Sequence, residues 1–166
     1  MAMIDGLLQE LEQEARTTRR VLERVPEDRL SWRPHPTART LGELALHVAI
    51  VPGAIAELAA SPSPAQVPRF ADPSPKAASE LIPALDAAIG KARKALGAMD
   101  DASLAATWRL MLGDRELFAI PRVAFLRSTM LNHWYHHRGQ LSVYLRQLGV
   151  KIPSIYGPSA DENPFG

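Results

Sequence analysis

Apolar residues recur every three or four positions in four stretches of the chain, which is the period of helices that bury one face. The stretches run from Asp5 to about Val25, from Leu41 to about Ala60, from about Pro75 to Met99, and from Pro121 to about Leu148. In the first stretch Glu and Arg residues occupy the opposite face. The pattern predicts four helices, three of them long, and an all-α fold of the four-helix-bundle type.

Residues with strong terminal preferences set the expected ends of these helices. Thr40 followed three residues later by Glu43 is a capping box, so the second helix should begin at Leu41. Ser74 and Pro75 suit the N-cap and first position of the third helix. Gly149 supplies the C-terminal cap of the last helix.

The segments between the helices differ in composition. Glu27 to Arg39 is predicted to be a loop that Trp32 anchors to the bundle, and His35, between two prolines, is expected to be exposed. Ser61 to Pro75 is rich in Pro, Ser and Ala, which indicates a long connection of poor helical character. In the tail, Val150 to Gly166, the apolar residues of the first half indicate that it lies along the bundle.

A change of period precedes the last helix. Thr107 to Ala119 is interrupted by Gly113 and Asp114, which suit a two-residue loop with positive φ at its first position. A short β-hairpin is therefore expected before the last helix. Because an isolated hairpin is marginally stable, it should pack on the helices.

Composition narrows the classes of protein. A chain of 166 residues suits one domain spanning 1–166. Its net charge of +1 gives no attraction to nucleic acid, so no nucleic-acid partner is expected. The chain has no cysteine, which excludes disulfides, thiolate metal sites and cysteine nucleophiles. With acidic residues near the start and no apolar run judged long enough to span a bilayer, we expect a cytoplasmic protein without a membrane partner.

Three of the five histidines lie within Asn132 to Gln140, written NHWYHHRGQ. His133 and His137 are four residues apart, so a helix stacks them on one face, where two imidazoles can hold a transition metal. They interrupt an apolar stripe made of Leu126, Met130, Leu141, Tyr144 and Leu148. Burying imidazoles is costly unless hydrogen-bonding groups or a metal satisfy them. His47 interrupts the inner face of the second helix in the same way.

Four motifs occur in order over nearly the whole chain: VPEDRLSWRPH, LGELALHVA around His47, the HxxxH of His133 and His137 running into RGQL, and PSIYGPSADE in the tail. In these the sequence resembles the DinB/YfiT-like superfamily. The resemblance implies a four-helix bundle, often dimeric, that carries a divalent metal on three histidines. Carried onto this sequence, the ligands are His47, His133 and His137. His136 matches an adjacent family histidine that is not a ligand.

Three neutral nitrogens leave a metal with open positions, as in a catalytic site. Zinc is favoured by three imidazoles, and nickel also suits nitrogen ligands. Glu43 and Gln140, one turn from His47 and His137, are candidates to accept the second imidazole proton. For Glu43, closing the capping box is the favoured role. Arg138 points away from the ligand face and is expected to form a structural ion pair.

Members of this family with known activity look like thiol S-transferases or thiol-dependent isomerases, in which a metal activates the thiol of a low-molecular-weight cosubstrate toward a small electrophilic molecule. The resemblance therefore implies a metal-dependent thiol transferase acting on a small-molecule substrate, as a homodimer. The alternative is a non-catalytic metal-binding stress-response bundle. A hydrolase would need a carboxylate base, and none is well placed. Trp32, Trp134 and Tyr156 could line the mouth of the site, although ordinary packing is the favoured interpretation.

Overall fold

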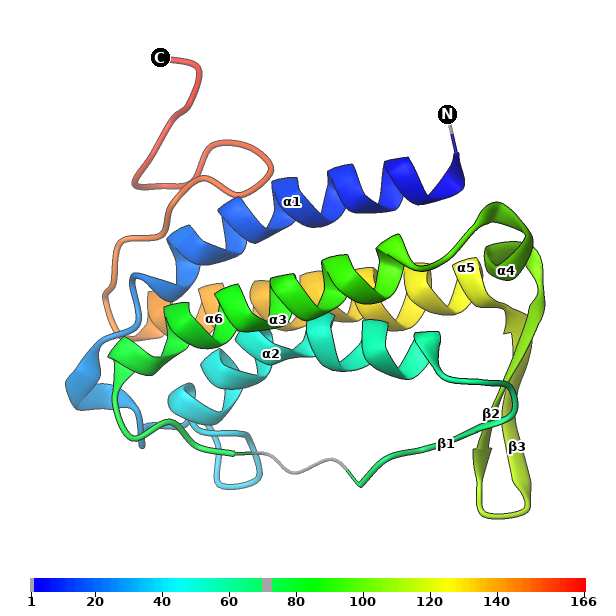
Figure 1. Cartoon of the computed structure of the whole chain (residues 1–166). Helices are drawn as coiled ribbons and strands as arrows, with labels where there is room; N and C mark the ends of the chain where they lie inside the picture. Colours follow the sequence, from blue (N-terminus) through cyan, green and yellow to red (C-terminus); the bar gives the residue numbers. More distant parts are fainter. Residues whose placement is uncertain (1, 70–72) are drawn as a thin grey trace.

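Four long helices run alongside one another in the computed structural model, which describes residues 2–69 and 73–166 (Figure 1). They are α1 (Met3–Leu22), α2 (Leu41–Ala60), α3 (Leu81–Gly97) and α6 (His133–Gln147). The shorter elements are the 3₁₀ turns η1 (Glu27–Arg29) and η2 (Ala78–Glu80), strands β1 (Ala65–Gln66), β2 (Thr107–Leu112) and β3 (Arg115–Pro121), helices α4 (Asp101–Ala105) and α5 (Arg122–Phe125), and the π-helix η3 (Leu126–Asn132). The predicted helical bundle is confirmed.

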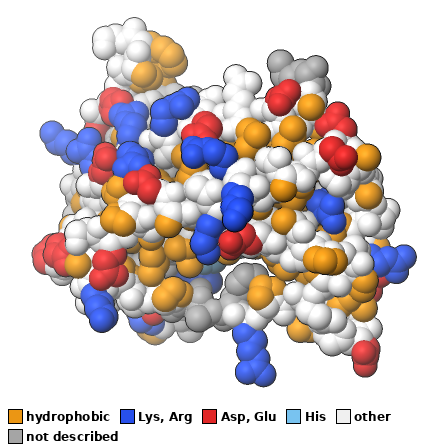
Figure 2. Space-filling model, viewed as in Figure 1, with side chains coloured by type: hydrophobic (Ala, Val, Ile, Leu, Met, Phe, Trp, Pro, Cys, Tyr) orange, Lys and Arg blue, Asp and Glu red, His pale blue; other side chains and the backbone are white. Residues whose placement is uncertain are grey.

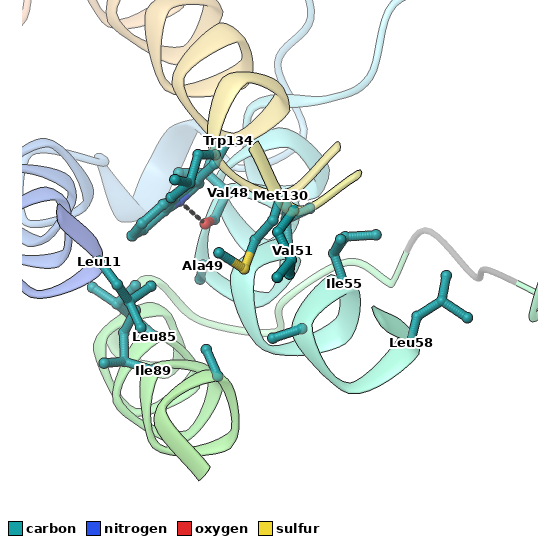
Figure 3. Close-up of a cluster of buried hydrophobic side chains, with 14 of the residues drawn as sticks. Leu11, Val48, Ala49, Val51, Ile55, Leu58, Leu85, Ile89, Met130 and Trp134 are labelled. Carbon is teal, nitrogen blue, oxygen red and sulfur yellow. Dashed lines mark hydrogen bonds between the residues drawn. The ribbon is translucent and has the colours of Figure 1, made fainter. Parts of the chain in front are cut away.

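The core lies where the inner faces of the long helices meet (Figure 3). Leu11 of α1 packs toward Leu85 of α3, and Met130 lies over α2; all three side chains are fully or almost fully buried. Trp134 is buried beside α2, and its Nε1–H donates to the Val48 carbonyl at 2.8 Å. This bond satisfies the indole donor and fixes the contact between α2 and α6.

The second helix begins as its sequence predicts. Thr40 Oγ1 accepts from the Glu43 backbone N–H at 3.1 Å, and Glu43 Oε2 accepts from the Thr40 N–H at 2.7 Å. The expected capping box is therefore present. Just past the end of α6 at Gln147, Gly149 adopts φ +73°, as a helix C-terminal glycine does.

The third helix begins at Leu81, so the prediction that it starts at Pro75 is wrong. In a helix from Leu81, Pro83 lies in the first turn, where its missing N–H costs no hydrogen bond. A start at Pro75 would place Pro83 in the helix interior and remove a backbone bond. Pro75 is instead buried close to Gly42, where a Cβ would lie 3.2 Å from the Pro75 ring.

The predicted hairpin is confirmed, and a third strand joins it. Strands β2 and β3 pair antiparallel around Gly113, which has φ +60°. The 61–75 connection, expected to be of poor helical character, contributes the short strand β1, which pairs parallel with β2 through Ala65 opposite Leu110. The edge of β2 that faces away from β3 offers backbone hydrogen-bonding groups to any extended segment. Strand β1 can therefore pair there without a strand-like pattern of side chains.

The predicted last helix is a continuous helical run of three segments, two α-helical segments with a π-helix between them. It follows Pro121, which caps α5 and does not occupy the first helical position, and passes through the π-helix η3 into α6. A π segment holds more residues per turn than an α-helix, so it rotates every later residue about the axis. The directions in which the α6 side chains point therefore cannot be predicted by extending the α-helical period of α5.

Helix α2 contradicts the expectation that no apolar run is long enough to cross a membrane. Within the described residues, Leu41–Ala60 meets that criterion by length and composition, with a mean hydropathy of 1.5 over its most apolar window. More than half of that window, 56%, is buried inside the protein. Its apolarity reflects its central place in the bundle, where α3 and α6 cover it.

Charges of both signs are interspersed on the face of the molecule that Figure 2 shows. Ion pairs also link α1 to α3, with Arg93 of α3 held by Glu12 of α1 at 2.6 Å and Arg19 of α1 held by Asp86 of α3. Each pair is largely exposed, so each contributes little to stability on its own. No single-sign field covers this face.

We predict that Gly53→Ala destabilises the fold by about 1–3 kcal/mol, the usual cost of overpacking. A Cβ at Gly53 would lie 2.7 Å from the Ala88 carbonyl oxygen and 2.8 Å from its Cα, so α2 and α3 would have to separate. Gly90→Ala is the control, because that α3 position is open and alanine should add about 0.5–1 kcal/mol. Urea unfolding measures the stability of both variants, and a Gly53→Ala variant as stable as the wild type would contradict the prediction.

Candidate metal centre

The structure brings together the three histidines expected to bind a metal. His47 comes from the second turn of α2, and His133 and His137 come from the first two turns of α6. Their ring centroids are 4.4 to 5.5 Å apart. One nitrogen from each ring can be chosen so that all three lie within 4.8 Å of one another.

The nitrogen positions fit one divalent ion. His47 Nε2 and His133 Nε2 are 3.2 Å apart, close to the roughly 3.3–3.4 Å expected between two ligands of tetrahedral zinc with Zn–N bonds of about 2.0–2.1 Å. If both nitrogens carried lone pairs they would repel each other at this distance. Either a proton or a cation must therefore lie between them, and a metal shared with His137 satisfies all three rings.

Burial keeps two of the rings in the neutral form that a metal requires. Desolvation, followed by the nearby charges of His136 and Arg39, lowers the pKa of His133. Desolvation lowers the pKa of His137 to about 4, although its bond to Gln140 acts in the opposite direction. Protons therefore compete weakly with a metal for these nitrogens at neutral pH.

Gln140 is the partner of His137 that the sequence suggested. Its Oε1 lies 2.7 Å from His137 Nδ1, so it accepts that proton and leaves Nε2 free to face the other rings. The Glu43 carboxylate accepts instead from the Thr40 backbone N–H. The capping interpretation of Glu43 is confirmed.

Arg39 belongs to the surroundings of the site and was missed in the sequence. Its positive charge helps to lower the pKa of both His133 and His137. It lies in the loop just before the Thr40 cap, and an irregular loop gives no periodicity from which its proximity to α6 could be predicted. The other two histidines stay outside the trio: His136 is exposed, and His35 is exposed and bonded to Thr37.

The aromatic residues proposed for the mouth of the site have mainly packing roles. Trp134 is fully buried, and Trp32 meets the Tyr144 ring edge-on with centroids 5.6 Å apart. Tyr156 bonds through its hydroxyl to Glu14 and Arg138, away from the histidines. Arg138 forms the structural ion pair that was expected of it, with Glu14.

Comparison with known sequences decides the family. The sequence profile of the DinB family matches residues 2–163. The chain belongs to the DinB family. A 33-residue segment is also 48% identical to the protein YrdA of Bacillus subtilis (strain 168), a match that spans 20% of that protein's length.

Solved structures show the same fold in this DinB protein's relatives. A DinB-like protein from Bacillus cereus ATCC 10987 is 26% identical, with a TM-score of 0.70 over 92% of this chain and 97% of that one. The DinB-like protein YjoA of Bacillus subtilis is 19% identical, with a TM-score of 0.67 over 90% of this chain and 97% of its own. The DinB fold therefore extends over nearly the whole chain.

We predict that His137→Ala removes stoichiometric metal while leaving most of the helical circular dichroism. The ring supplies one of three ligands and little of the core, so its loss should affect binding far more than folding. His136→Ala is the matched control, since that ring is the exposed neighbour. Metal content after dialysis against a chelator measures both, and full metal in His137→Ala would show that the assignment is wrong.

We predict that Gln140→Met weakens metal binding by about 10-fold or more, as is usual when the partner of a ligating imidazole is removed. Without the acceptor on Nδ1, His137 can rotate or take the wrong tautomer. Gln147→Met, at the exposed end of α6, is the control. Competition with a coloured chelator gives both affinities, and equal values would assign Gln140 no part in the site.

Proposed function

We propose that this DinB protein binds one divalent transition metal, zinc or nickel, on His47, His133 and His137, and uses it in the transfer of a low-molecular-weight thiol to a small electrophile. The observation that carries the proposal is the convergence of three imidazole nitrogens from two helices within 4.8 Å. The chain has no cysteine, so any thiol in the reaction must come from a cosubstrate.

The donor set supports a reactive centre more than a sealed one. Three protein ligands leave at least one coordination position for an outside molecule, the arrangement of catalytic zinc sites. His47 and His133 are only partly buried, which leaves that side of the trio within reach of solvent. Nitrogen ligands suit both zinc and nickel, so the donor set alone does not choose between them.

When bound, the metal would lower the pKa of a coordinated thiol and so raise the fraction of nucleophilic sulfur at neutral pH. In the transfer, the sulfur forms a bond to the electrophilic carbon and the bond from that carbon to its leaving group breaks. The thiol proton departs with the leaving group, so no oxidant or reductant is needed. In an isomerisation the thiol would add and then be released.

The protein's own residues prepare this chemistry. Burial keeps His133 and His137 neutral, and Gln140 fixes which nitrogen of His137 faces inward. The positive charge of Arg39 nearby would favour an anionic sulfur or substrate group over a neutral one. Trp32 and Tyr144 offer aromatic surface farther along α6.

The proposal also concerns partners and location. We infer a cytoplasmic homodimer that acts on small molecules and has neither a nucleic-acid nor a membrane partner. The interspersed charges on the face that Figure 2 shows and the burial of α2 support this inference. Exposed Leu117 and Phe118 on the hairpin offer apolar area for a second copy.

The test begins with metal analysis of the purified protein, followed by assays with zinc or nickel restored. Several bacterial thiols are each combined with electrophiles such as chlorodinitrobenzene, and thioether formation is followed with His136→Ala and His137→Ala in parallel. We expect metal-dependent turnover that His137→Ala abolishes and His136→Ala retains. Stoichiometric metal without turnover for any pair, together with a fall of many degrees in melting temperature on chelation, would overturn the transferase proposal in favour of a structural metal.

A further inference from the structure

Behind the histidines, α6 carries a buried ion pair. Arg138 of α6 and Glu14 of α1 are 2.6 Å apart, with side chains only 1% and 6% exposed. Arg138 Nη1 also donates to Thr18 Oγ1 at 3.1 Å and to the Glu14 backbone carbonyl at 3.3 Å. The guanidinium is therefore held by α1 through several bonds at once.

The C-terminal tail completes this cluster. The Tyr156 hydroxyl donates to Glu14 Oε2 at 2.9 Å and accepts from Arg138 Nη2. The guanidinium carbon also lies 5.1 Å from the centre of the Tyr156 ring. Tyr156 is 67% exposed as a whole, but desolvation of its hydroxyl and the Glu14 carboxylate raise the pKa of Tyr156 to about 12 in spite of Arg138, so the hydroxyl keeps its proton.

The cluster is not explained by stability alone. A buried ion pair must repay the loss of hydration of two charges, and well-packed apolar side chains in its place are often as stable or more so. What such a pair adds is a preference for one arrangement, because any rotation of either helix would leave charges buried without a partner. Its value lies in specifying geometry.

The geometry at stake is the rotation of α6. Arg138 directly follows His137, so the two side chains leave the helix about 100° apart, one toward α2 and the other toward α1. The π-helix Leu126–Asn132 lies immediately before His133 and uncouples the facing of α6 from that of α5. The ion pair of Arg138 with Glu14 then fixes the rotation of α6 about its own axis, which the π-helix does not determine.

We propose that Glu14, Arg138 and Tyr156 form a positioning cluster for the metal centre, which turns His133 and His137 toward His47 and makes metal affinity depend on the C-terminal tail. This inference rests on the proposed metal centre. None of the three residues contacts the metal; each acts through the orientation of α6. The tail is part of the site because its tyrosine closes the cluster.

The decisive variant is the double substitution Glu14→Leu with Arg138→Met, which removes both charges and keeps apolar volume. Its control is Glu12→Leu with Arg93→Met, which removes an exposed ion pair between α1 and α3. Urea unfolding of the metal-free proteins reports stability. Competition with a coloured chelator reports zinc affinity, and the visible spectrum of bound Co²⁺ reports the arrangement of the ligands.

We expect the double variant to unfold at a urea concentration near that of the wild type, yet to bind zinc about 10-fold or more weakly and to show an altered Co²⁺ spectrum. The control should match the wild type in both. A stable double variant with unchanged affinity and spectrum would overturn the inference. A wild type that binds no metal would instead refute the metal centre itself.

Tyr156→Phe tests the tail separately and decides the matter if the double variant fails to fold. It keeps the ring beside the guanidinium and removes only the hydroxyl. We expect weaker zinc binding than in the wild type and a changed Co²⁺ spectrum, with the urea midpoint little altered. Unchanged affinity and spectrum in this variant would overturn the role of the tail.

Discussion

The arrangement of the candidate metal centre depends on one buried hydrogen bond that fixes the contact between α2 and α6. Trp134 donates to the Val48 carbonyl at 2.8 Å, and each of these residues is the immediate neighbour of a candidate ligand, His133 on one helix and His47 on the other. The bond is buried, so a displacement of either helix would leave an indole donor unsatisfied. The two helices are thereby held at the separation that brings imidazole nitrogens from both close enough to share one metal ion.

The site needs opposite properties from its two sides. The histidines must stay neutral, and desolvation provides this by penalising their charged form. On the far side of α6, the Arg138 guanidinium is paired with the Glu14 carboxylate, which is buried with it. One helix thus presents uncharged imidazoles to α2 and a charge to α1. A helix with such contrasting faces has few ways to sit in the bundle, and this limits the ligands to one arrangement.

The sequence predicted the parts of the fold that rest on periodicity and on terminal residues. Helix α2, its Thr40 cap and the inward histidines followed from such patterns, and the i, i+4 spacing of His133 and His137 identified two of the three candidate ligands. Strand β1 could not be predicted in this way, because it is set by pairing with β2, which is distant in sequence. The predicted start of α3 is too early, although Pro83 argues for a start at Leu81. Pro75 packs near Gly42, Ala65 pairs with Leu110, and Arg39 reaches the site from a loop without a pattern.

The order of the ligands along the chain has a consequence for biosynthesis. His47 emerges from the ribosome early, but its two companions and the tyrosine that steadies their helix lie 86 residues or more further on. A growing polypeptide therefore carries only one of the three candidate ligands until these later residues are made. Capture of an ion by the full trio would therefore wait until α6 docks against α2, which would spare partly made chains from holding metal tightly.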